Sequence, residues 1–527
     1  MNEDNNLRKG LGFWSLTAAA LSSVIGSGWL FGAWKAAQLA GPESIVGWIV
    51  GGIAMMLVGI VFAELGMVKP ESGGLVRYPK YSNGSLVASI IGLALWLGYV
   101  ANPPTEASGV VQYLSQFHAL SGLYNATSGN LTASGIGAAI VLMLIFVCVN
   151  YFGVQLFARV NTFITAIKFI VPTVTVVALL VHGFHASHFT DPKLGGFAPK
   201  GWGAGLSAIA TAGIVFAYTG FRNAVDLSGE AKNPRRNVPL ALITTLIVAI
   251  VLYILLEIVF IGATPNSDLT HGWAGVNFNS PFVDIAMSVN LMWLYWMLMA
   301  DAAISPSGSS FAYTAANSRN VYALAKNRLL PRFFAHINPK YGVPTRGLFL
   351  NFVVGLLFLI PLKSWYGIIS LTGALAVYTF CAGSVSAIVF RKMGLSRGNT
   401  IKGMNVIAPL AFVVATLIIY WSGWGTLWKT GIILLICLAI YVVTYFFNKE
   451  ENVELRGGLW IVVYLAVVLF LSSIGGKTFG GTGWIPEPYA SILVALVSLA
   501  IFYVGVGSGV WYMKKTRHFE QLEWGES

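Results

Sequence analysis

The sequence predicts an all-helical integral membrane protein with about fourteen transmembrane helices, two of them interrupted. The first indication is composition: the 527 residues are 56% hydrophobic and only 10% charged, too few polar side chains to cover a water-soluble core. The second is a series of apolar stretches of about 20 residues each. The third is a pair of helix-breaking motifs within such stretches, Gly26-Ser27-Gly28 and Tyr218-Thr219-Gly220-Phe221.

The apolar stretches follow one another along most of the chain. Those with the length of a membrane span are residues 12–40, 44–68, 84–117, 134–152, 157–182, 203–229, 237–262, 282–317, 345–361, 365–391, 404–422, 426–447, 457–474 and 489–513. Two of them, 84–117 and 282–317, are longer than a perpendicular span, so we expect them to tilt or to continue past the membrane. The longest hydrophilic stretch, residues 317–345, is too short for a soluble domain.

The basic residues predict the orientation. With the N-terminus in the cytoplasm, most of the 32 lysines and arginines fall in inner loops, as the positive-inside rule requires. The outer loops then hold Lys193, Lys200, Lys363 and Lys477. We therefore expect a multi-pass protein of the cell membrane, with residues 1–11 and 514–527 in the cytoplasm. The net charge of +12 follows from this topology and gives little support to nucleic-acid binding.

The motifs of other function classes are missing from the sequence. Gly476-Lys477-Thr478 lacks the upstream glycine that a phosphate-binding loop requires. Cys148, Cys381 and Cys437 do not have metal-ligand spacing, and no motif pairs a nucleophile with a base. We therefore expect no cofactor, no metal and no enzymatic activity. A secondary transporter is favoured over a channel or a membrane enzyme because paired broken helices are typical of secondary transporters.

The two interruptions predict a binding site near the middle of the membrane. Helix-breaking backbone at that depth is tolerated only where it is buried in protein or lines a cavity. The interruptions fall in the first and sixth apolar stretches, which are corresponding places if residues 12–182 and 203–391 are inverted repeats. The alternative is that Gly26 and Gly28 only allow close helix packing. It is disfavoured because residues two apart do not share a helix face.

Ile25-Gly26-Ser27-Gly28-Trp29-Leu30-Phe31 resembles the first-helix motif of the amino acid–polyamine–organocation permeases. Further motifs of that family are matched by residues 62–66, 70–74, 216–221, 230–234, 318–319 and 330–331. The resemblance covers residues 12–391 and implies a leucine-transporter-like core of five plus five inverted helices, with helices 1 and 6 discontinuous. Residues 404–513 would add four helices. Within the family, the sequence is most similar to bacterial aspartate:proton symporters.

The resemblance and the chemistry of broken helices imply the same amino acid site. Half-helix N-termini expose unpaired N–H groups and a positive dipole end, which suit a carboxylate. The expected carboxylate-binding residues are Ile25, Gly26, Ser27 and Gly28. The carbonyls expected to accept hydrogen bonds from an α-ammonium group, at positions that match the family's amine-binding residues, are those of Phe216, Ala217 and Thr219. Trp29 and Phe221 are candidates for an aromatic gate.

Lys168 lies in the middle of the fifth apolar stretch, too deep for its ammonium to reach the interface easily. A buried amine can alternate between charged and neutral forms in the physiological range. In proton-coupled members of the family, a lysine at the matching position replaces a sodium ion and touches helices 1 and 8. The resemblance therefore implies that Lys168 couples transport to a proton. The alternative is a lysine held in a permanent ion pair, and Ser307, Ser309 and Ser310 keep sodium coupling open.

Arg222 begins the second half of the sixth stretch, where a cation opposes the helix dipole and needs compensation. One candidate is the side-chain carboxylate of a bound aspartate or glutamate, held by the guanidinium. The other is an internal ion pair with Asp226 or Glu106. Both alternatives remain open from the sequence. Glu64, Glu106 and Asp226 are also candidates for a gate or a proton relay, because an unpaired carboxylate within a span is costly.

These observations together predict a secondary active transporter that imports an amino acid by proton symport through alternating access. Aspartate and glutamate are the substrate candidates that Arg222 suggests. Two other transport modes remain as alternatives: an exchanger of amino acids or polyamines, and a sodium-coupled amino acid symporter. The expected partners are the amino acid, a proton and the lipid bilayer.

Overall fold

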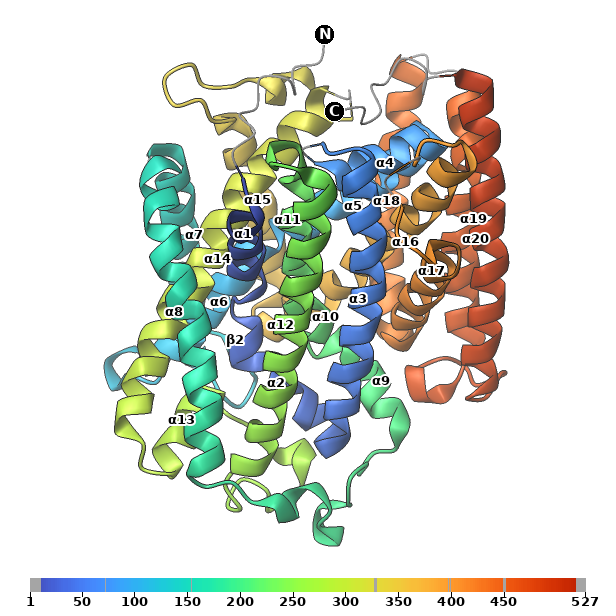
Figure 1. Cartoon of the computed structure of the whole chain (residues 1–527). Coiled ribbons are helices and arrows are strands. Elements are labelled where there is room, and N and C mark those ends of the chain that lie inside the picture. Colours follow the sequence, from blue (N-terminus) through green and yellow to red (C-terminus); the bar gives the residue numbers. More distant parts are fainter. Residues whose placement is uncertain are drawn as a thin grey trace.

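The computed structural model describes residues 11–71, 73–152, 154–326, 329–396, 398, 400–448 and 452–517. Within these residues the chain is a bundle of helices, most of which run along a common direction (Figure 1). Apart from Leu11, the predicted N-terminal segment lies outside the described residues. The predicted tail after Arg517 and Ser72 of the second family motif also lie outside them.

The helices before the central loop are α1 (Phe13–Val24), α2 (Gly28–Ala40), α3 (Ser44–Val68), α4 (Gly74–Asn83), α5 (Ser85–Val100), α6 (Asn102–Leu114), α7 (Ala133–Phe152) and α8 (Val154–Val181). A short antiparallel pair, β1 (Tyr124–Asn125) and β2 (Asn130–Leu131), lies between α6 and α7. The next elements are α9 (Trp202–Thr211), α10 (Ile214–Tyr218), the 3-10 turn η6 (Thr219–Phe221), α11 (Arg222–Asp226), α12 (Pro234–Ala263), α13 (Pro281–Ser288) and α14 (Met292–Lys326). The chain continues with α15 (Thr345–Leu362), α16 (Trp365–Lys392), α17 (Met404–Trp421), α18 (Trp424–Asn448), α19 (Asn452–Ile474) and α20 (Tyr489–Thr516).

Each predicted apolar stretch coincides with one helix or with consecutive helical segments. Among the described residues, 11 helices are long and apolar enough to cross a membrane, or 12 if the bent pair that begins with α9 is one span. The total is below fourteen because α2 and α3 count together as one continuous stretch and α14 is not among the candidates. The all-helical membrane fold is therefore confirmed, and fourteen spans stay a prediction.

The two longest predicted stretches are each divided in the structure. The stretch 84–117 forms α5 and α6, which separate at Ala101, where Asn102 and two prolines follow. The stretch 282–317 includes all of α13 except Pro281 and most of α14, with Asn290 between them at a φ of +57°. A positive φ is tolerated by asparagine better than by most residues, and it ends the first helix there. Hydrophobicity alone does not reveal these divisions.

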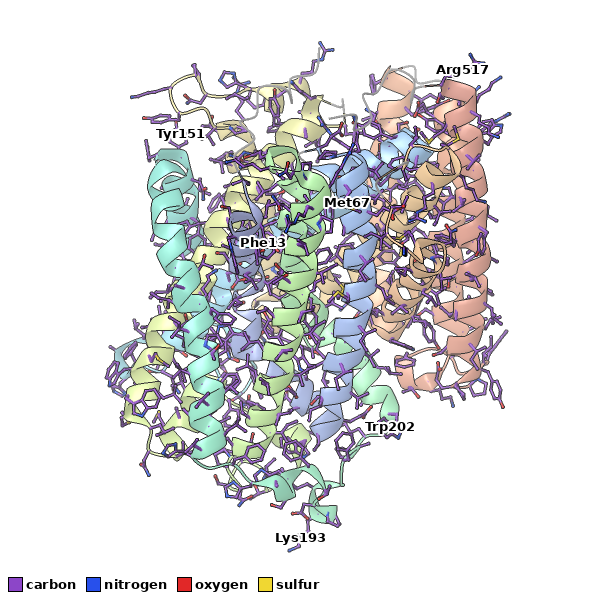
Figure 2. All side chains as sticks on the ribbon, viewed as in Figure 1. Phe13, Met67, Tyr151, Lys193, Trp202 and Arg517 are labelled. Atoms are coloured by element: carbon purple, nitrogen blue, oxygen red, sulfur yellow. The ribbon has the colours of Figure 1, made fainter. Side chains whose placement is uncertain are left out.

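The surface of the bundle identifies the side that faces lipid. In α7 the side chains of Val141, Leu144 and Phe152 are exposed, and an exposed apolar helix face of this kind suits hydrocarbon. By contrast, the most apolar part of α16 is wholly buried within the protein. Tyr151 and Arg517 lie at one end of the molecule and Lys193 at the other (Figure 2). This separation agrees with the predicted topology, in which Lys193 lies in an outer loop.

The packing of the helices places the first interruption inside the bundle. The pair α3 and α12 pack along each other, as do α6 and α14, and α1 contacts α8, α12 and α14. The additional helices α17 to α20 cover one side of this core, where α17 packs against α3 and α16, and α18 and α19 pack against α5. Consequently the ends of α1 and α2 that meet at the first interruption are enclosed by α6, α8, α12 and α14.

Candidate functional site

The first interruption separates α1 from α2 at the predicted position. Ile25 has an extended backbone, with φ −88° and ψ 91°, which ends α1, and α2 begins at Gly28. A Cβ at Gly26 would be 2.5 Å from Oε1 of Glu106, so a side chain there would force that carboxylate to move. A discontinuous first span is therefore confirmed. The close approach of this carboxylate favours glycine at position 26.

The second interruption begins earlier than the sequence indicates. The chain bends by 49° between α9 and α10, at Ala212 and Gly213. Gly213 has a φ of +94°, a conformation that glycine adopts readily and other residues rarely do. The predicted motif, Tyr218 to Phe221, is instead the end of α10 and the 3-10 turn η6. The discontinuous sixth span is confirmed, but its sharpest bend precedes the predicted motif.

The two interrupted spans meet at Gly220. A Cβ at Gly220 would lie 2.3 Å from the backbone nitrogen of Val24 and 2.4 Å from the carbonyl carbon of Ser23. Tyr253 of α12 ties the same crossing together, because its hydroxyl donates to the carbonyl oxygens of Val24 at 2.8 Å and of Ala217 at 3.4 Å. The end of α1 is thereby fixed against the turn η6.

Glu106 of α6 occupies the start of α2. Its Oε2 accepts a hydrogen bond of 2.8 Å from the backbone amide of Ser27, and its Oε1 accepts one of 3.3 Å from Asn102. The Ser27 hydroxyl in turn accepts from the indole nitrogen of Trp365 at 2.6 Å. A protein carboxylate therefore binds the half-helix terminus at which the sequence predicts the substrate carboxylate. The sequence suggests Glu106 as a gate, a relay or an ion-pair partner of Arg222, and does not indicate this contact with Ser27.

The three carbonyls predicted to bind an ammonium group already accept hydrogen bonds within the protein. That of Phe216 accepts from the Thr219 hydroxyl at 2.8 Å, and that of Thr219 accepts from Nε of Arg222 at 3.1 Å. The third, on Ala217, accepts from Tyr253. The carbonyls of Phe216 and Thr219 also accept from the backbone amides of Thr219 and Arg222, so a substrate ammonium would have to replace one of these bonds.

A small closed cavity lies beside these carbonyls. It is lined by Gly98, Asn102, Phe216, Thr219, Arg222, Tyr313, Thr372, Gly373 and Ala376. Its volume is about 10 Å³, which is room for roughly one water molecule and not for an amino acid. The predicted residues outside this lining are Ile25, Gly26, Ser27, Gly28, Ala217 and Phe221. This cavity is therefore too small for an amino acid, and Phe216, Thr219 and Arg222 are the predicted substrate-binding residues that line it.

Arg222 is buried at the edge of this cavity. Its guanidinium carbon lies 4.6 Å above the ring of Tyr99 and 6.0 Å from the ring centre of Phe380. Among the described residues, Nη1 of Arg222 has no hydrogen-bond partner. Asp226, one turn later, accepts from the Tyr99 hydroxyl at 2.6 Å, and no ion pair joins it to Arg222 in the described part of the chain. The guanidinium thus lies against aromatic rings and interacts electrostatically with Asp226, and its Nη1 has no hydrogen-bond partner in the described residues.

Lys168 of α8 is fully buried against two other helices. Its ammonium donates to the carbonyl oxygen of Ser22 in α1 at 2.7 Å. It also lies against Gly308 of α14, where an added Cβ would be 3.3 Å from Nζ. These are the two helices that the family resemblance implies. The carboxylates that interact electrostatically with this ammonium are those of Glu106 and Asp301.

Polar side chains without partners follow α14 past Lys168. Asp301 accepts from the Ser305 hydroxyl at 2.7 Å, and its other oxygen has no partner within the described residues. The same is true of the hydroxyls of Ser309, Ser310 and Thr314. Buried polar groups are normally satisfied, so these four groups suit an ordered water or a small ligand. The sequence indicated the serines but not their arrangement with Asp301.

The remaining predicted residues lie at different distances from this centre. Trp29 packs on Phe282, with 5.6 Å between ring centres, and Phe221 packs on Phe380, also at 5.6 Å. Glu64 is placed elsewhere, where it forms a bidentate ion pair with Arg391 of α16 through contacts of 2.6 and 2.7 Å. The gating roles of these residues stay predictions.

Comparison with known proteins gives consistent matches. The model of a family described as amino acid permease matches residues 11–471. The chain is 40% identical over 530 residues to the glutamate/serine transporter AimA of Bacillus subtilis, a match that covers 98% of this chain and 96% of the relative. It is 35% identical to the aspartate-proton symporter of the same organism, over 95% of this chain and 97% of the relative. The branched-chain amino acid permease BcaP is 25% identical.

Proposed function

This chain belongs to the amino acid permease family, and on that premise we propose that it imports an amino acid together with a proton by alternating access. The observation that carries the proposal is the bond from the Ser27 amide to Glu106, because it fills the place of a substrate carboxylate. Two carboxylates would repel each other there. Substrate therefore binds when Glu106 moves away, and protonation of Glu106 weakens its hold on Ser27.

Lys168 connects the proposed proton site to the end of α1. Its ammonium holds Ser22 at the end of α1 and interacts with Glu106 and Asp301 from neighbouring helices. A proton gained or lost by Lys168, Glu106 or Asp301 changes the electrostatic attraction between the helices that carry or contact them, α1, α6, α8 and α14. If the proton and the substrate favour the same conformation, each raises the apparent affinity of the other. The chain's own carboxylate thus makes amino acid binding depend on a proton.

We propose that the substrate is an acidic amino acid. The free Nη1 of Arg222 at the closed cavity is a donor suited to a side-chain carboxylate, and Asp226 is engaged by Tyr99 instead. The names of the two relatives, a glutamate/serine transporter and an aspartate-proton symporter, agree with an acidic substrate. The α-carboxylate would replace Glu106 on Ser27, while the α-ammonium would bind the carbonyls of Phe216, Ala217 and Thr219.

Sodium symport is the principal alternative. It draws support from the unpartnered hydroxyls of Ser309 and Ser310 on α14. We favour proton symport because the ammonium of Lys168 already donates a hydrogen bond to the carbonyl oxygen of Ser22 near these serines. A cation there would have to displace a buried positive charge.

We also propose the placement of the chain in the membrane. The protein would lie in the cell membrane with Leu11 and Arg517 on the cytoplasmic side, since most basic loops are then inside. Residues 12–182 and 203–391 would be the two inverted repeats of the transport core. The interruptions after α1 and after α9 support this division, because they fall at corresponding places in the two halves.

Uptake by the purified chain in proteoliposomes tests the function. Twenty amino acids are compared with and without an inward pH gradient, and with and without sodium. We expect accumulation of glutamate and aspartate that requires the pH gradient and ignores sodium. Accumulation that requires sodium, or exchange that no gradient drives, would select one of the alternatives and reject proton symport.

A further inference from the structure

A second cavity lies between the additional helices and the transport core. It is found where α16 ends at Lys392 and α17 begins, and its volume is about 460 Å³. Its lining residues are Ile388, Arg391, Lys392, Gly394, Ser396, Thr400, Asn405, Phe502 and Tyr503. The three helices that supply most of them, α16, α17 and α20, pack against one another on the same side of the molecule (Figure 1). Neither the proposed transport site nor its ions involve this cavity.

The polar end of the cavity suits an anion. Asn405 is in the first turn of α17, whose capping residue, Gly403, provides no side-chain cap. The neighbouring amides of Met404 and Val406 donate to carbonyls, whereas no described residue accepts from the amide of Asn405. Lys392 is exposed at the same place, and no described residue pairs with its ammonium. Arg391 uses Nε and Nη2 for Glu64 and for the carbonyl of Ile401, which leaves Nη1 for a further acceptor.

Ser396 provides a separate indication that a ligand binds. Its side chain lines the cavity and is only 3% exposed, yet its hydroxyl has no hydrogen-bond partner within the described residues. A buried hydroxyl without a partner costs free energy, and such groups are rare in folded proteins. An anionic oxygen in the cavity would accept the bond that Ser396 lacks.

The other end of the cavity is apolar and reaches the lipid-facing surface. Ile388 and Phe502 are buried there, while Tyr503 of α20 is 53% exposed and the next residue, Val504, is 61% exposed. Exposed apolar side chains in the middle of a membrane helix face acyl chains. The cavity therefore joins a polar end, at the ends of α16 and α17, to the hydrocarbon region beside α20.

We propose that this cavity binds an anionic phospholipid. The phosphate would accept hydrogen bonds from Lys392, from the Ser396 hydroxyl and from the backbone amide of Asn405, and an acyl chain would lie along α20 at Tyr503. Basic pockets between transmembrane helices on the cytoplasmic side are suited to lipid headgroups. Inorganic phosphate would satisfy the polar end but not the apolar one, so the lipid matches more of the observed lining.

Native mass spectrometry of the full chain tests the proposal. The protein is offered phosphatidylglycerol and phosphatidylethanolamine with identical acyl chains. We expect preferential retention of phosphatidylglycerol, and the double variant Lys392→Gln/Ser396→Ala should retain roughly fivefold less of it. The control is Lys402→Gln, which removes an exposed lysine from the same loop without touching the cavity. Equal retention of the two lipids, or an equal loss in the control, would overturn the proposal.

Two further arms separate the lipid from free phosphate and from misfolding. A large excess of inorganic phosphate should not displace phosphatidylglycerol, and displacement would assign the cavity to free phosphate instead. Phosphatidylglycerol should also raise the thermal unfolding temperature of the unmodified protein relative to phosphatidylethanolamine. In phosphatidylethanolamine, the double variant should unfold at the same temperature as the unmodified protein. Phosphatidylglycerol should no longer raise the unfolding temperature of the double variant. An increment that persists in the variant would reject the cavity as the lipid site.

Discussion

The carboxylate of Glu106 lies 2.8 Å from the backbone nitrogen of Ser27, so α6 supplies the acceptor for the broken end of α2. The arrangement leaves no space beside it, since a side chain at Gly26 would collide with the same carboxylate. A negative group is favoured at that helix terminus by the unpaired amides and the dipole. We propose that the substrate carboxylate binds the same amide, so that it competes with Glu106 for one place. Removing the charge of Glu106 should then abolish the dependence of transport on a proton without abolishing substrate binding.

Glu106→Gln should abolish proton-driven accumulation while substrate exchange remains. Glutamine keeps an oxygen that can accept from the Ser27 amide, but it has no proton to gain or lose in this range. The measurement compares uptake driven by a pH gradient with counterflow between equal pH values. Glu257→Gln is the control, because Glu257 is also a fully buried carboxylate but binds Trp48 of α3 instead. Gradient-driven accumulation by Glu106→Gln would contradict the coupling role.

Arg222→Gln should lose acidic substrates selectively. A charge-assisted hydrogen bond from the free Nη1 would be removed, so the half-saturation concentration for glutamate should rise roughly tenfold to a hundredfold. Serine uptake should change little, because serine has no side-chain carboxylate. Arg236→Gln, at an exposed position near the start of α12, controls for the loss of one positive charge. Equal losses for serine and glutamate would assign Arg222 to an internal structural role.

The sequence predicts the helices well because their lengths are set by the membrane. Long apolar stretches mark them, and glycine with serine inside such a stretch marks the interruption at Gly26. The sequence does not indicate the bend at Gly213, because glycine is common in membrane helices. Only the φ of +94° in the structure distinguishes this glycine from the others in such helices. The division between α13 and α14 also depends on one backbone conformation, that of Asn290.

The contacts of the site are less predictable because they join distant parts of the chain. Ser27 binds Glu106, which is 79 positions away, and Trp365, which is 338 positions away. Tyr99 and Asp226 are 127 positions apart. The sequence offers Asp226 as a partner for Arg222 by spacing, yet the structure engages that carboxylate with Tyr99. Lys168 was placed against α1 and α14 only through the family resemblance, since no local pattern encodes those contacts.

Gly220→Ala should destabilise the protein through the crossing of the two interrupted spans. The added methyl group would meet the backbone of Val24 and Ser23, which cannot move as a side-chain end can. Overpacking of this kind costs roughly 1–3 kcal/mol, so the thermal unfolding temperature of the purified protein should fall. Gly137→Ala is the matched control in α7, where a Cβ would meet nothing within 4 Å. Equal unfolding temperatures for the two variants would show that the crossing is looser than described.

Lys168→Met should remove proton coupling in the same way as Glu106→Gln. Methionine fills much of the lysine volume but cannot donate to the Ser22 carbonyl, so α1 loses its charged contact with α8. Lys429→Met, at an exposed position in α18, is the control and should accumulate substrate normally.

The double variant Lys168→Met/Glu106→Gln decides whether the two residues form one proton site. Residues that act as a unit give non-additive losses, so gradient-driven uptake by the double variant should fall no further than in either single variant. The initial rate of glutamate uptake under a fixed pH gradient measures this. Losses that multiply would indicate two separate proton sites, with Lys168 then paired to Asp301, the other carboxylate that interacts with its ammonium.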